Sequence, residues 1–468
     1  MDTELMVKTR FAPSPTGLMH YGNLRTALFN YLFAKKNEGT FLLRIEDTDR
    51  VRSTNHYLED LLIDLEWLGI NWQEGPMKQS EREPIYEQYY RKLTENNLAY
   101  PCFCSEETLA ISRKVQMASN KPPRYEGTCR HLSEQQRAEK FATGQKAALR
   151  FAIPKGSRIE FTDLVKGLQS FAAEDIGDFI IRRSDGTASF MFCNAIDDAL
   201  MEVTHALRGD DHLTNTPRQL WILKALNLPA PQYGHFPMIV GPDGTKLSKR
   251  NGSRSIQELR LEGFHILAIL NYLSGLGHHY TTPKLRNISE LAHEFSLDNI
   301  ASSPARFDAA QLQYWQKEAM HQSSAEEFWN LTAPFVQDRV PSEKKQAWID
   351  CIQANIIMPA ETLSWAEIFF TDKLEYSDTA VKILQAATPQ FFVTAIEFVQ
   401  QKDTIYYSAL IQYLQSTLNI KGKAIFMPLR IGVTGESAGP EMAKLFELMG
   451  KELLIKRLEK AKKHAQHL

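Results

Sequence analysis

Two short segments of the chain carry residue types that can bind phosphate. In the first, His20 and Gly22 stand at the expected approach to a helix, where an imidazole can donate to phosphate oxygens and a glycine lets a ligand come close to the backbone. In the second, Lys246 and Lys249 flank Leu-Ser after a turn-rich run and can neutralise phosphate charge. Alone, each pattern fits a helix cap or a solvated basic turn equally well. Together they predict a nucleotide site.

A third pattern consists of cysteines at metal-ligand spacing. Cys102 and Cys104 are followed, 24 residues later, by Cys129 and His131. Three thiolates and an imidazole form a closed set of four ligands, which suits a structural zinc ion and leaves no position for a catalytic water. Tyr125 is the alternative fourth ligand, and reduced cysteines without a metal are the alternative to the whole site.

The histidine of the first segment is expected at the turn of a strand–helix–strand unit. Residues 7–11 form a short extended run, residues 24–36 space their apolar side chains as a helix does, and residues 41–45 resemble a buried strand. Such a unit places its ligand site at the carboxyl end of the first strand, beside the start of the helix. Residues 102–186 break into short β-like runs, as an insertion would, and the nucleotide-binding fold resumes near Phe190.

Helical periodicity takes over after Arg250. The apolar positions of two predicted helical faces are Ile266, Leu267, Leu270, Leu273 and Leu276 for the first, and Leu445, Leu448, Leu453 and Leu454 for the second. The predicted fold is therefore an α/β Rossmann-type catalytic domain with an inserted α+β domain, followed by all-helical C-terminal domains.

Composition places the chain among globular proteins of about two to four domains, with 468 residues of which 43% are hydrophobic. The net charge of −2 gives no indication of a nucleic-acid partner. An acidic start and the lack of an apolar run of about 18 residues argue against secretion and membrane insertion, so we expect a cytoplasmic protein. Cys193 and Cys351 stand apart from the cysteine cluster and are expected to be buried.

The two phosphate-binding segments resemble the HIGH and KMSKS signatures of class I aminoacyl-tRNA synthetases. Other short sequence segments resemble those of bacterial-type glutamyl-tRNA synthetases. They include RIEDTDR at 44–50, RGDDH at 208–212, SPARFD at 303–308 and FMPLR at 426–430. This resemblance covers essentially the whole chain. Glutaminyl-tRNA synthetases share the nucleotide-binding half but carry a β-barrel anticodon region, whereas the last third of this chain is predicted to be helical.

The resemblance implies a glutamate–tRNA ligase that works as a monomer. It would activate L-glutamate with ATP and Mg²⁺ and transfer the glutamyl group to the 3′-terminal adenosine of tRNA(Glu), with tRNA(Gln) as an alternative substrate. It also implies a structural Zn²⁺ ion. The expected segments are 1–101 and 188–250 for the two halves of the catalytic domain, 102–187 for an inserted acceptor-binding domain with the zinc site, 251–320 for a helical domain that contacts the tRNA stem, and 321–468 for helical anticodon-binding domains.

The resemblance also assigns residues to the site. Arg10 and Arg208 are the natural partners for the carboxylates of glutamate, because a guanidinium can hold a carboxylate through two parallel hydrogen bonds, and Glu46 would hold the ammonium group. Without the resemblance, a structural salt bridge explains each of them. The implied glutamate-binding residues are Arg10, Ser14, Glu46, Phe190, Asn194 and Arg208. The implied ATP-binding residues are Thr16, Gly17, His20, Gly22, Lys246, Ser248 and Lys249, of which His20, Lys246 and Lys249 are catalytic.

Two departures from the family pattern lie close to this expected site. Phe190 replaces a tyrosine of relatives, which removes a phenolic hydroxyl from the glutamate pocket, and Asn251 replaces the histidine that usually follows the lysine–arginine pair. Two other classes of protein remain as alternatives. A nucleotidyltransferase that works without tRNA would lack the long helical extension, and an RNA-binding regulator would not need His20, Lys246 and Lys249.

Overall fold

The structure is a computed structural model in which the chain divides into two compact units. It describes residues 6–49, 51–120 and 123–466, apart from the side chain of Lys249. Unit 1 comprises Met1–Leu259 and Ile269–Gln311, and unit 2 comprises Arg260–Ala268 and Leu312–Leu468. No helix within the described ranges is long and apolar enough to cross a membrane.

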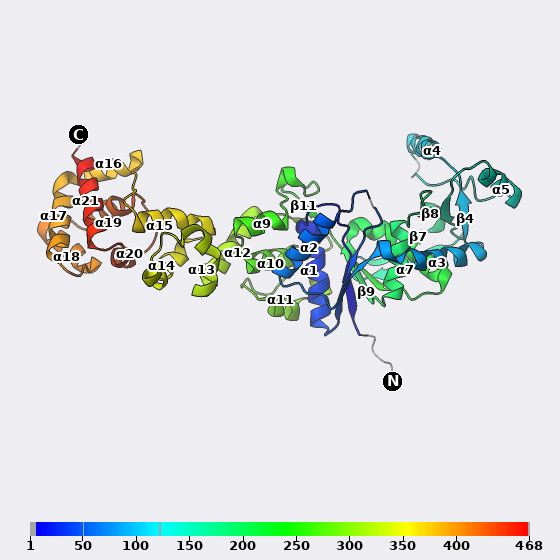
Figure 1. Cartoon of the computed structure of the whole chain (residues 1–468), viewed down its shortest axis with the longest axis horizontal. Helices are drawn as coiled ribbons and strands as arrows, with labels where there is room; N and C mark the ends of the chain where they lie inside the picture. The colour runs from blue at the N-terminus through cyan, green and yellow to red at the C-terminus, as the bar shows by residue number, and fades with distance from the viewer. Residues whose placement is uncertain (1–5, 50, 121–122, 467–468) are drawn as a thin grey trace. The chain divides into compact units, whose positions relative to one another are not determined.

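Unit 1 contains a five-stranded parallel sheet (Figure 1). Its strands stand in the order β10 (Gln232–Phe236), β9 (His205–Gly209), β1 (Lys8–Phe11), β2 (Thr40–Ile45) and β3 (Glu74–Lys78). Strands β1 and β2 are joined through helix α1 (Tyr21–Lys36), which confirms the predicted strand–helix–strand unit. Because β2 and β9 lie on opposite sides of β1, the strand order reverses between β1 and β9, where sheets of this kind bind ligands at the carboxyl ends.

Helix α1 begins at Tyr21 rather than at the predicted Leu24. The prediction was wrong because Gly22 and Asn23 are poor helix formers, whereas in the structure Tyr21 is fully buried and His20 caps the helix. The backbone N–H of Gly22 donates to Nδ1 of His20 at 3.2 Å, and a Cβ at position 22 would lie 3.2 Å from the ring. The glycine therefore lets the imidazole lie across the first turn.

The inserted segment forms two small antiparallel sheets. One contains β4 (Ala99–Cys102), β5 (Ala148–Phe151) and β8 (Phe179–Arg182), and the other is a hairpin of β6 (Arg158–Asp163) and β7 (Gly167–Ala172). Its helices are α4 (Glu106–Ala118), α5 (Glu134–Ala142) and α6 (Ala173–Ile176). The hairpin reaches the main sheet directly, since the N–H of Leu164 donates to the carbonyl of Tyr233 on β10 at 2.8 Å.

Further helices occur along the chain between residues 55 and 294. They are α2 (Asn55–Trp67), α3 (Glu83–Glu95), α7 (Phe190–Leu200), α8 (Thr216–Leu226), α9 (Ile256–Glu262), α10 (Ile266–Gly275) and α11 (Ile288–Glu294). Two short strands, β11 (Ile239–Val240) and β12 (Ala305–Arg306), pair in parallel. Helices α3, α7 and α8 share a buried core with β5 and β8, in which Tyr90 stacks on Phe192.

Unit 2 is built from helices (Figure 1). They are α12 (Ala309–Gln322), α13 (Ala325–Val336), α14 (Lys345–Ile352), α15 (Thr362–Phe370), α16 (Asp378–Ala386), α17 (Thr388–Gln401), α18 (Tyr407–Leu418), α19 (Lys423–Thr434), α20 (Met442–Met449) and α21 (Lys451–Ala465). The second predicted apolar face was wrongly placed on one helix, because Gly450 with φ of 77° separates α20 from α21. Leu448 and Leu454 are buried on either side of this break.

Candidate active site

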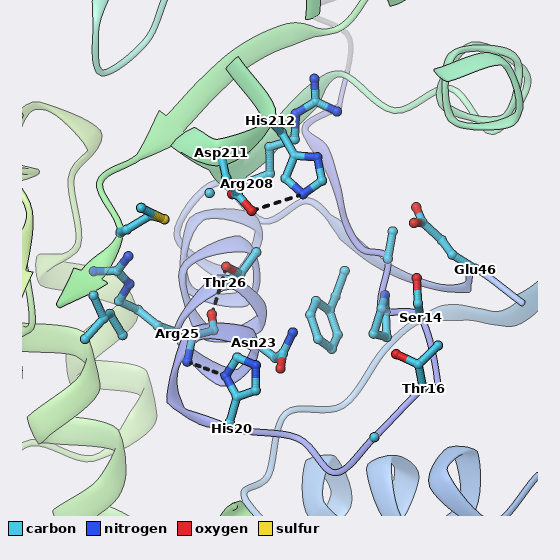
Figure 2. A pocket seen from close by; sticks show the side chains of 18 of the residues that line it. Ser14, Thr16, His20, Asn23, Arg25, Thr26, Glu46, Arg208, Asp211 and His212 are labelled. Atoms are coloured by element: carbon cyan, nitrogen blue, oxygen red, sulfur yellow. Dashed lines mark hydrogen bonds and ion pairs between the residues drawn. The ribbon is translucent and has the colours of Figure 1, made fainter. Parts of the chain in front are cut away.

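A pocket of about 490 Å³ lies at the carboxyl ends of β1, β2 and β9 (Figure 2). It brings together all the residues predicted to bind glutamate, which are Arg10, Ser14, Glu46, Phe190, Asn194 and Arg208. It also contains five of those predicted to bind ATP, namely Thr16, Gly17, His20, Gly22 and Lys246. Figure 2 shows His20 at one end of the pocket and Arg208 with His212 at the opposite end.

The end formed by His20 is suited to phosphate. Partial burial and the nearby charge of Lys246 lower the pKa of His20, so the ring is neutral at neutral pH. Because Nδ1 accepts from the N–H of Gly22, the neutral ring carries its proton on Nε2, which is then free to donate. The start of α1 adds the positive end of the helix dipole.

The KLSKR segment contributes Lys246 to the pocket lining, whereas Ser248 is not part of that lining. The backbone N–H and the hydroxyl of Ser248 both donate to Oδ1 of Asn251, at 2.6 and 3.1 Å. Nδ2 of Asn251 donates in turn to the carbonyl of Lys246 at 3.2 Å. Asn251, at a position where the family resemblance predicts a histidine, therefore joins the two sides of this loop. The side chain of Lys249, predicted to be catalytic, lies outside the described residues.

Arg10 belongs to a buried cluster of opposite charges. Asp198 accepts from Nε of Arg10 at 3.1 Å and from Nη1 of Arg44 at 2.7 Å, and Nη1 of Arg10 donates to the carbonyl of Leu207 at 3.2 Å. Burial opposes the ionisation of Asp198, but the two guanidinium groups hold its pKa below the usual range. Glu46 lies 3.6 Å from Arg44, and burial raises the pKa of Glu46 although both arginines oppose this.

Arg208 has a different environment. Its Nε donates to Nε2 of His235 at 3.2 Å, and its Nη2 donates to Thr216 and Gln219 at 2.8 and 2.7 Å. Its Nη1 is buried and has no hydrogen-bond partner among the described residues. Burial lowers the pKa of Arg208 to about 10. The described partners of this buried cation are therefore all neutral, and one nitrogen is left for a ligand.

Phe190 lies on the wall of the pocket near the Arg208 end. Its ring centroid is 5.1 Å from that of His212, with 32° between the ring planes. Burial and the charge of Arg208 lower the pKa of His212 to about 4, so the imidazole is neutral at neutral pH. Asn194, one turn along α7, accepts from Nη2 of Arg44 at 2.7 Å. Helix α7 therefore supplies both an apolar and a polar part of the wall.

Comparison with known proteins identifies the family. The catalytic domain of class I tRNA synthetases (E and Q) matches residues 6–314. The chain belongs to this family. An anticodon binding domain matches residues 325–462, so the helical part of the synthetase also corresponds to a known domain.

Relatives of the synthetase resemble it over nearly its whole length. Glutamate–tRNA ligase 2 of Coxiella burnetii is 49% identical over 97% of this chain and 100% of its own. Glutamate–tRNA ligase 2 of Nitrosococcus oceani is 48% identical over 97% of this chain and 98% of its own. The crystal structure of a glutamate tRNA ligase from Elizabethkingia meningosepticum, in complex with its amino acid, has a TM-score of 0.89 at 27% identity and covers 98% of this chain and 99% of that chain.

The synthetase gathers three cysteines in its inserted segment. The sulfur atoms of Cys102, Cys104 and Cys129 all lie within 4.8 Å of one another. The phenolic oxygen of Tyr125 lies 3.5 Å from Sγ of Cys102 and 3.6 Å from Sγ of Cys104. His131, the fourth ligand predicted from the sequence, is exposed and lies outside this group. Of the two alternatives, the structure therefore places the tyrosine rather than the histidine beside the thiols.

The two remaining cysteines are buried, as predicted. Cys193 lies on α7 and Cys351 on α14, and all five cysteines are free. Burial raises the pKa of both thiols, which agrees with inert packing residues.

Sequence reasoning gave no role to Arg44, Asp198 and His235. A signal for Arg44 was present, because a charged residue in an otherwise apolar strand must be paired when it is buried. Its partner Asp198 is 154 residues away, and nothing in the sequence alone connects the two. His235 had no such signal, since a single histidine in a strand most often only packs.

Proposed function

We propose that the synthetase is a glutamate–tRNA ligase. The observation that carries this proposal is one pocket with two chemically different ends. His20 and Lys246 lie at a helix start suited to ATP, and Arg208 at the other end is a buried cation with neutral partners among the described residues. The full-length similarity to glutamate–tRNA ligases supports it. ATP with Mg²⁺ is the general energy source of class I synthetases.

In the first step, an oxygen of the α-carboxylate of glutamate attacks the α-phosphorus of ATP, and pyrophosphate leaves. His20 donates from Nε2 to a phosphate oxygen, and Lys246 offsets the charge that develops on pyrophosphate. The family resemblance assigns the same role to Lys249. In the second step, a ribose hydroxyl of the 3′-terminal adenosine of tRNA attacks the carbonyl carbon of the adenylate, and AMP leaves.

Arg208 and Glu46 carry charges that complement the carboxylate and ammonium groups of glutamate. A buried cation without a counter-ion is costly, so a glutamate carboxylate that enters beside Nη1 of Arg208 is stabilised strongly. Burial raises the pKa of Glu46, and the ammonium group of glutamate favours its ionised form. Binding of the substrate therefore completes the charge balance at both positions. The family resemblance assigns Ser14, Asn194 and Phe190 to the same subsite, and all three line the pocket.

Charging assays with purified tRNA test this function. The protein is expected to attach glutamate, and not glutamine, to tRNA(Glu), and His20→Ala should lower kcat/KM by roughly 2–4 kcal/mol of transition-state stabilisation. Charging of tRNA(Gln) with glutamate in the same assay would extend the proposal to that second tRNA. Absence of charging by the wild-type protein with either tRNA would overturn it.

We also propose that the adenylate forms only with tRNA bound, as the family resemblance implies. Exchange of pyrophosphate into ATP is then expected with glutamate and tRNA(Glu) together. Rapid exchange with glutamate alone would contradict this. The same proposal includes a monomeric enzyme with five segments. Residues 1–101 and 188–250 form the two halves of the catalytic domain, and residues 102–187 form the inserted domain that binds the acceptor end. Residues 251–320 contact the tRNA stem, and residues 321–468 bind the anticodon.

We propose a structural zinc ion in the inserted segment, held by Cys102, Cys104, Cys129 and Tyr125. For a tetrahedral ion with Zn–S of about 2.3 Å and Zn–O of about 2.0 Å, two sulfurs lie about 3.8 Å apart and a sulfur and an oxygen about 3.5 Å apart. Sγ of Cys104 and Cys129 are 3.6 Å apart, and the tyrosine oxygen lies 3.5 and 3.6 Å from its two sulfurs. These three distances match a tetrahedral ion, and all the sulfur atoms lie within 4.8 Å of one another.

Elemental analysis of protein purified without added metal should give one zinc per chain. Tyr125→Phe is expected to weaken zinc retention against a chelator, whereas His131→Ala should leave it unchanged, because His131 is exposed and outside the cysteine group. The reverse order would restore His131 as the fourth ligand. Zinc well below one equivalent in the wild-type protein would remove the site.

A further inference from the structure

The orientation of Arg208 depends on a buried row of three side chains. Strands β9 and β10 are adjacent and parallel, and Arg208 and His235 are partners in their register. Nε of Arg208 donates to Nε2 of His235 at 3.2 Å, and Nδ1 of His235 lies 2.5 Å from Oδ2 of Asp163. The side chains of His235 and Asp163 have no exposed surface, so solvent cannot replace either hydrogen bond.

Asp163 is an ionised acceptor held from two sides. Its Oδ1 accepts from the backbone N–H groups of His235, Val165 and Lys166 at 3.2, 2.9 and 2.8 Å. Burial opposes ionisation, but the hydrogen bonds from His235 and from the backbone hold the pKa of Asp163 below its usual range. An ionised carboxylate can only accept, so Nδ1 of His235 must carry a proton.

The proton on Nδ1 decides what His235 offers to Arg208. Burial lowers the pKa of His235, so the ring is neutral and its Nε2 carries a lone pair. This lone pair accepts from Nε–H of Arg208, and the hydroxyl of Thr216 lies 3.1 Å from the same nitrogen. The opposite tautomer would place an N–H group against the N–H of the guanidinium.

We infer that Asp163 and His235 are positioning residues for glutamate: Asp163 sets the tautomer of His235, and His235 holds Arg208 so that its Nη1 stays available to a carboxylate of the substrate. This inference rests on the proposed function. Asp163 is the last residue of β6, so the inserted hairpin takes part in selecting the amino acid. Neither residue reaches the substrate; both act through Arg208.

The substitution Asp163→Asn tests the inference with little change in shape. The amide oxygen can still accept the backbone N–H groups, while its NH₂ donates to Nδ1 and moves the ring proton to Nε2, as the same change does to the histidine of a serine-protease triad. The KM for glutamate should rise about 10- to 100-fold, while kcat and the KM for ATP stay within about twofold. Glu160→Gln, an exposed carboxylate-to-amide change on the same strand, should alter none of these constants.

A pair of substitutions at His235 provides the rescue test. His235→Gln places an amide oxygen near the position of Nε2 and can still accept from Arg208, whereas His235→Asn is too short to reach it. The KM for glutamate should therefore stay closer to wild type in the glutamine variant than in the asparagine variant. This pair decides the matter if Asp163→Asn does not fold.

The ¹⁵N NMR signals of His235 provide a readout that needs no charging activity. The ring proton should sit on Nδ1 in the wild-type protein and on Nε2 in Asp163→Asn. A wild-type ring protonated on Nε2, or a KM for glutamate unchanged in Asp163→Asn, would overturn the inference. An equal rise of the KM for ATP would show a general structural role instead. If the wild-type protein does not charge tRNA with glutamate, the proposed function fails, and the ligand assigned to Arg208 fails with it, whatever the tautomer.

Discussion

Arg10 and Arg208 line the same pocket, but their guanidinium groups have opposite electrostatic surroundings. All three nitrogens of Arg10 are engaged by Asp198 and a backbone carbonyl, and Arg44 shares the same carboxylate. Arg208 instead meets a histidine ring, a hydroxyl and an amide, and keeps Nη1 unpartnered among the described residues. Residue type and burial are the same, so the difference lies in the partners.

This difference separates a structural charge from a charge prepared for a ligand. A buried ion pair that loses one member leaves the other uncompensated, so the folded state depends on the Arg10 cluster. A buried cation among neutral groups lowers the stability of the free enzyme. Binding of an anion beside it offsets this loss. The family resemblance assigned both arginines as glutamate ligands; in the structure, Arg208 is the one with a whole nitrogen, Nη1, that has no partner among the described residues.

The largest expected effect is a loss of stability when the buried cluster of Arg10, Arg44 and Asp198 is broken. Arg44→Met leaves Asp198 with one cation instead of two and should lower the free energy of unfolding by about 3–5 kcal/mol, measured by chemical denaturation. Arg52→Met is the matched control, because Arg52 pairs with Asp49 at the surface and should change stability little. Similar small effects of both variants would remove the structural role of the cluster.

For Arg208, we expect the opposite pattern, which is a small effect on stability and a large effect on catalysis. Arg208→Met removes a buried cation but also its hydrogen bonds to neutral groups, so the free energy of unfolding should change much less than in Arg44→Met, while kcat/KM for glutamate falls by roughly 2–4 kcal/mol. Thermal unfolding and glutamate charging, measured on the same preparation, check both parts. A marked loss of stability would show that Arg208, like Arg10, is a structural residue, and would contradict the proposed difference between the two arginines.

A pH effect is expected from Glu46 in the paired cluster. Its pKa is raised in the folded protein, mainly by burial, so folding favours the protonated form. As pH rises from the unfolded carboxyl value of about 4.3 through the folded pKa, Glu46 should progressively destabilise the fold, and the effect should then level off. The stability difference between wild type and Glu46→Gln, measured from about pH 4 to 7 without glutamate, should follow this course. A constant difference would mean that Arg44 and Arg10 fully compensate the burial.

The smallest expected effect concerns the wall next to Arg208. Phe190→Tyr adds the hydroxyl that the family resemblance predicts at this position, and a neutral hydrogen bond contributes about 0.5–1.5 kcal/mol. The KM for glutamate should fall several fold with kcat little changed, because the hydroxyl binds ground state and transition state alike. Steady-state charging at varied glutamate concentration measures this. A higher KM would show that the pocket has closed around the phenyl ring and His212.

Much of the site could be predicted because it follows from local chemistry. The ends of parallel strands lie at one edge of the sheet, so the predicted strand–helix–strand unit brings Arg10 and Glu46 together. Arg208 lies on β9, outside that unit, and was assigned to the site by the family resemblance. Spacing alone likewise brought three cysteines into one group. The start of α1 was misplaced because a buried tyrosine and a cap outweighed the weak helix propensity of Gly22 and Asn23.

The sequence by itself determined which kinds of side chain stand at the strand ends and at the helix start, because these depend on periodicity and on neighbouring residues. The tertiary structure alone decided how their charges are paired. Arg10 meets Asp198 across 188 residues and His235 meets Asp163 across 72, and a buried charge takes its state from partners within a few ångströms rather than from its own segment. Whether an arginine is used by the fold or left for a substrate is therefore a property of the packed core.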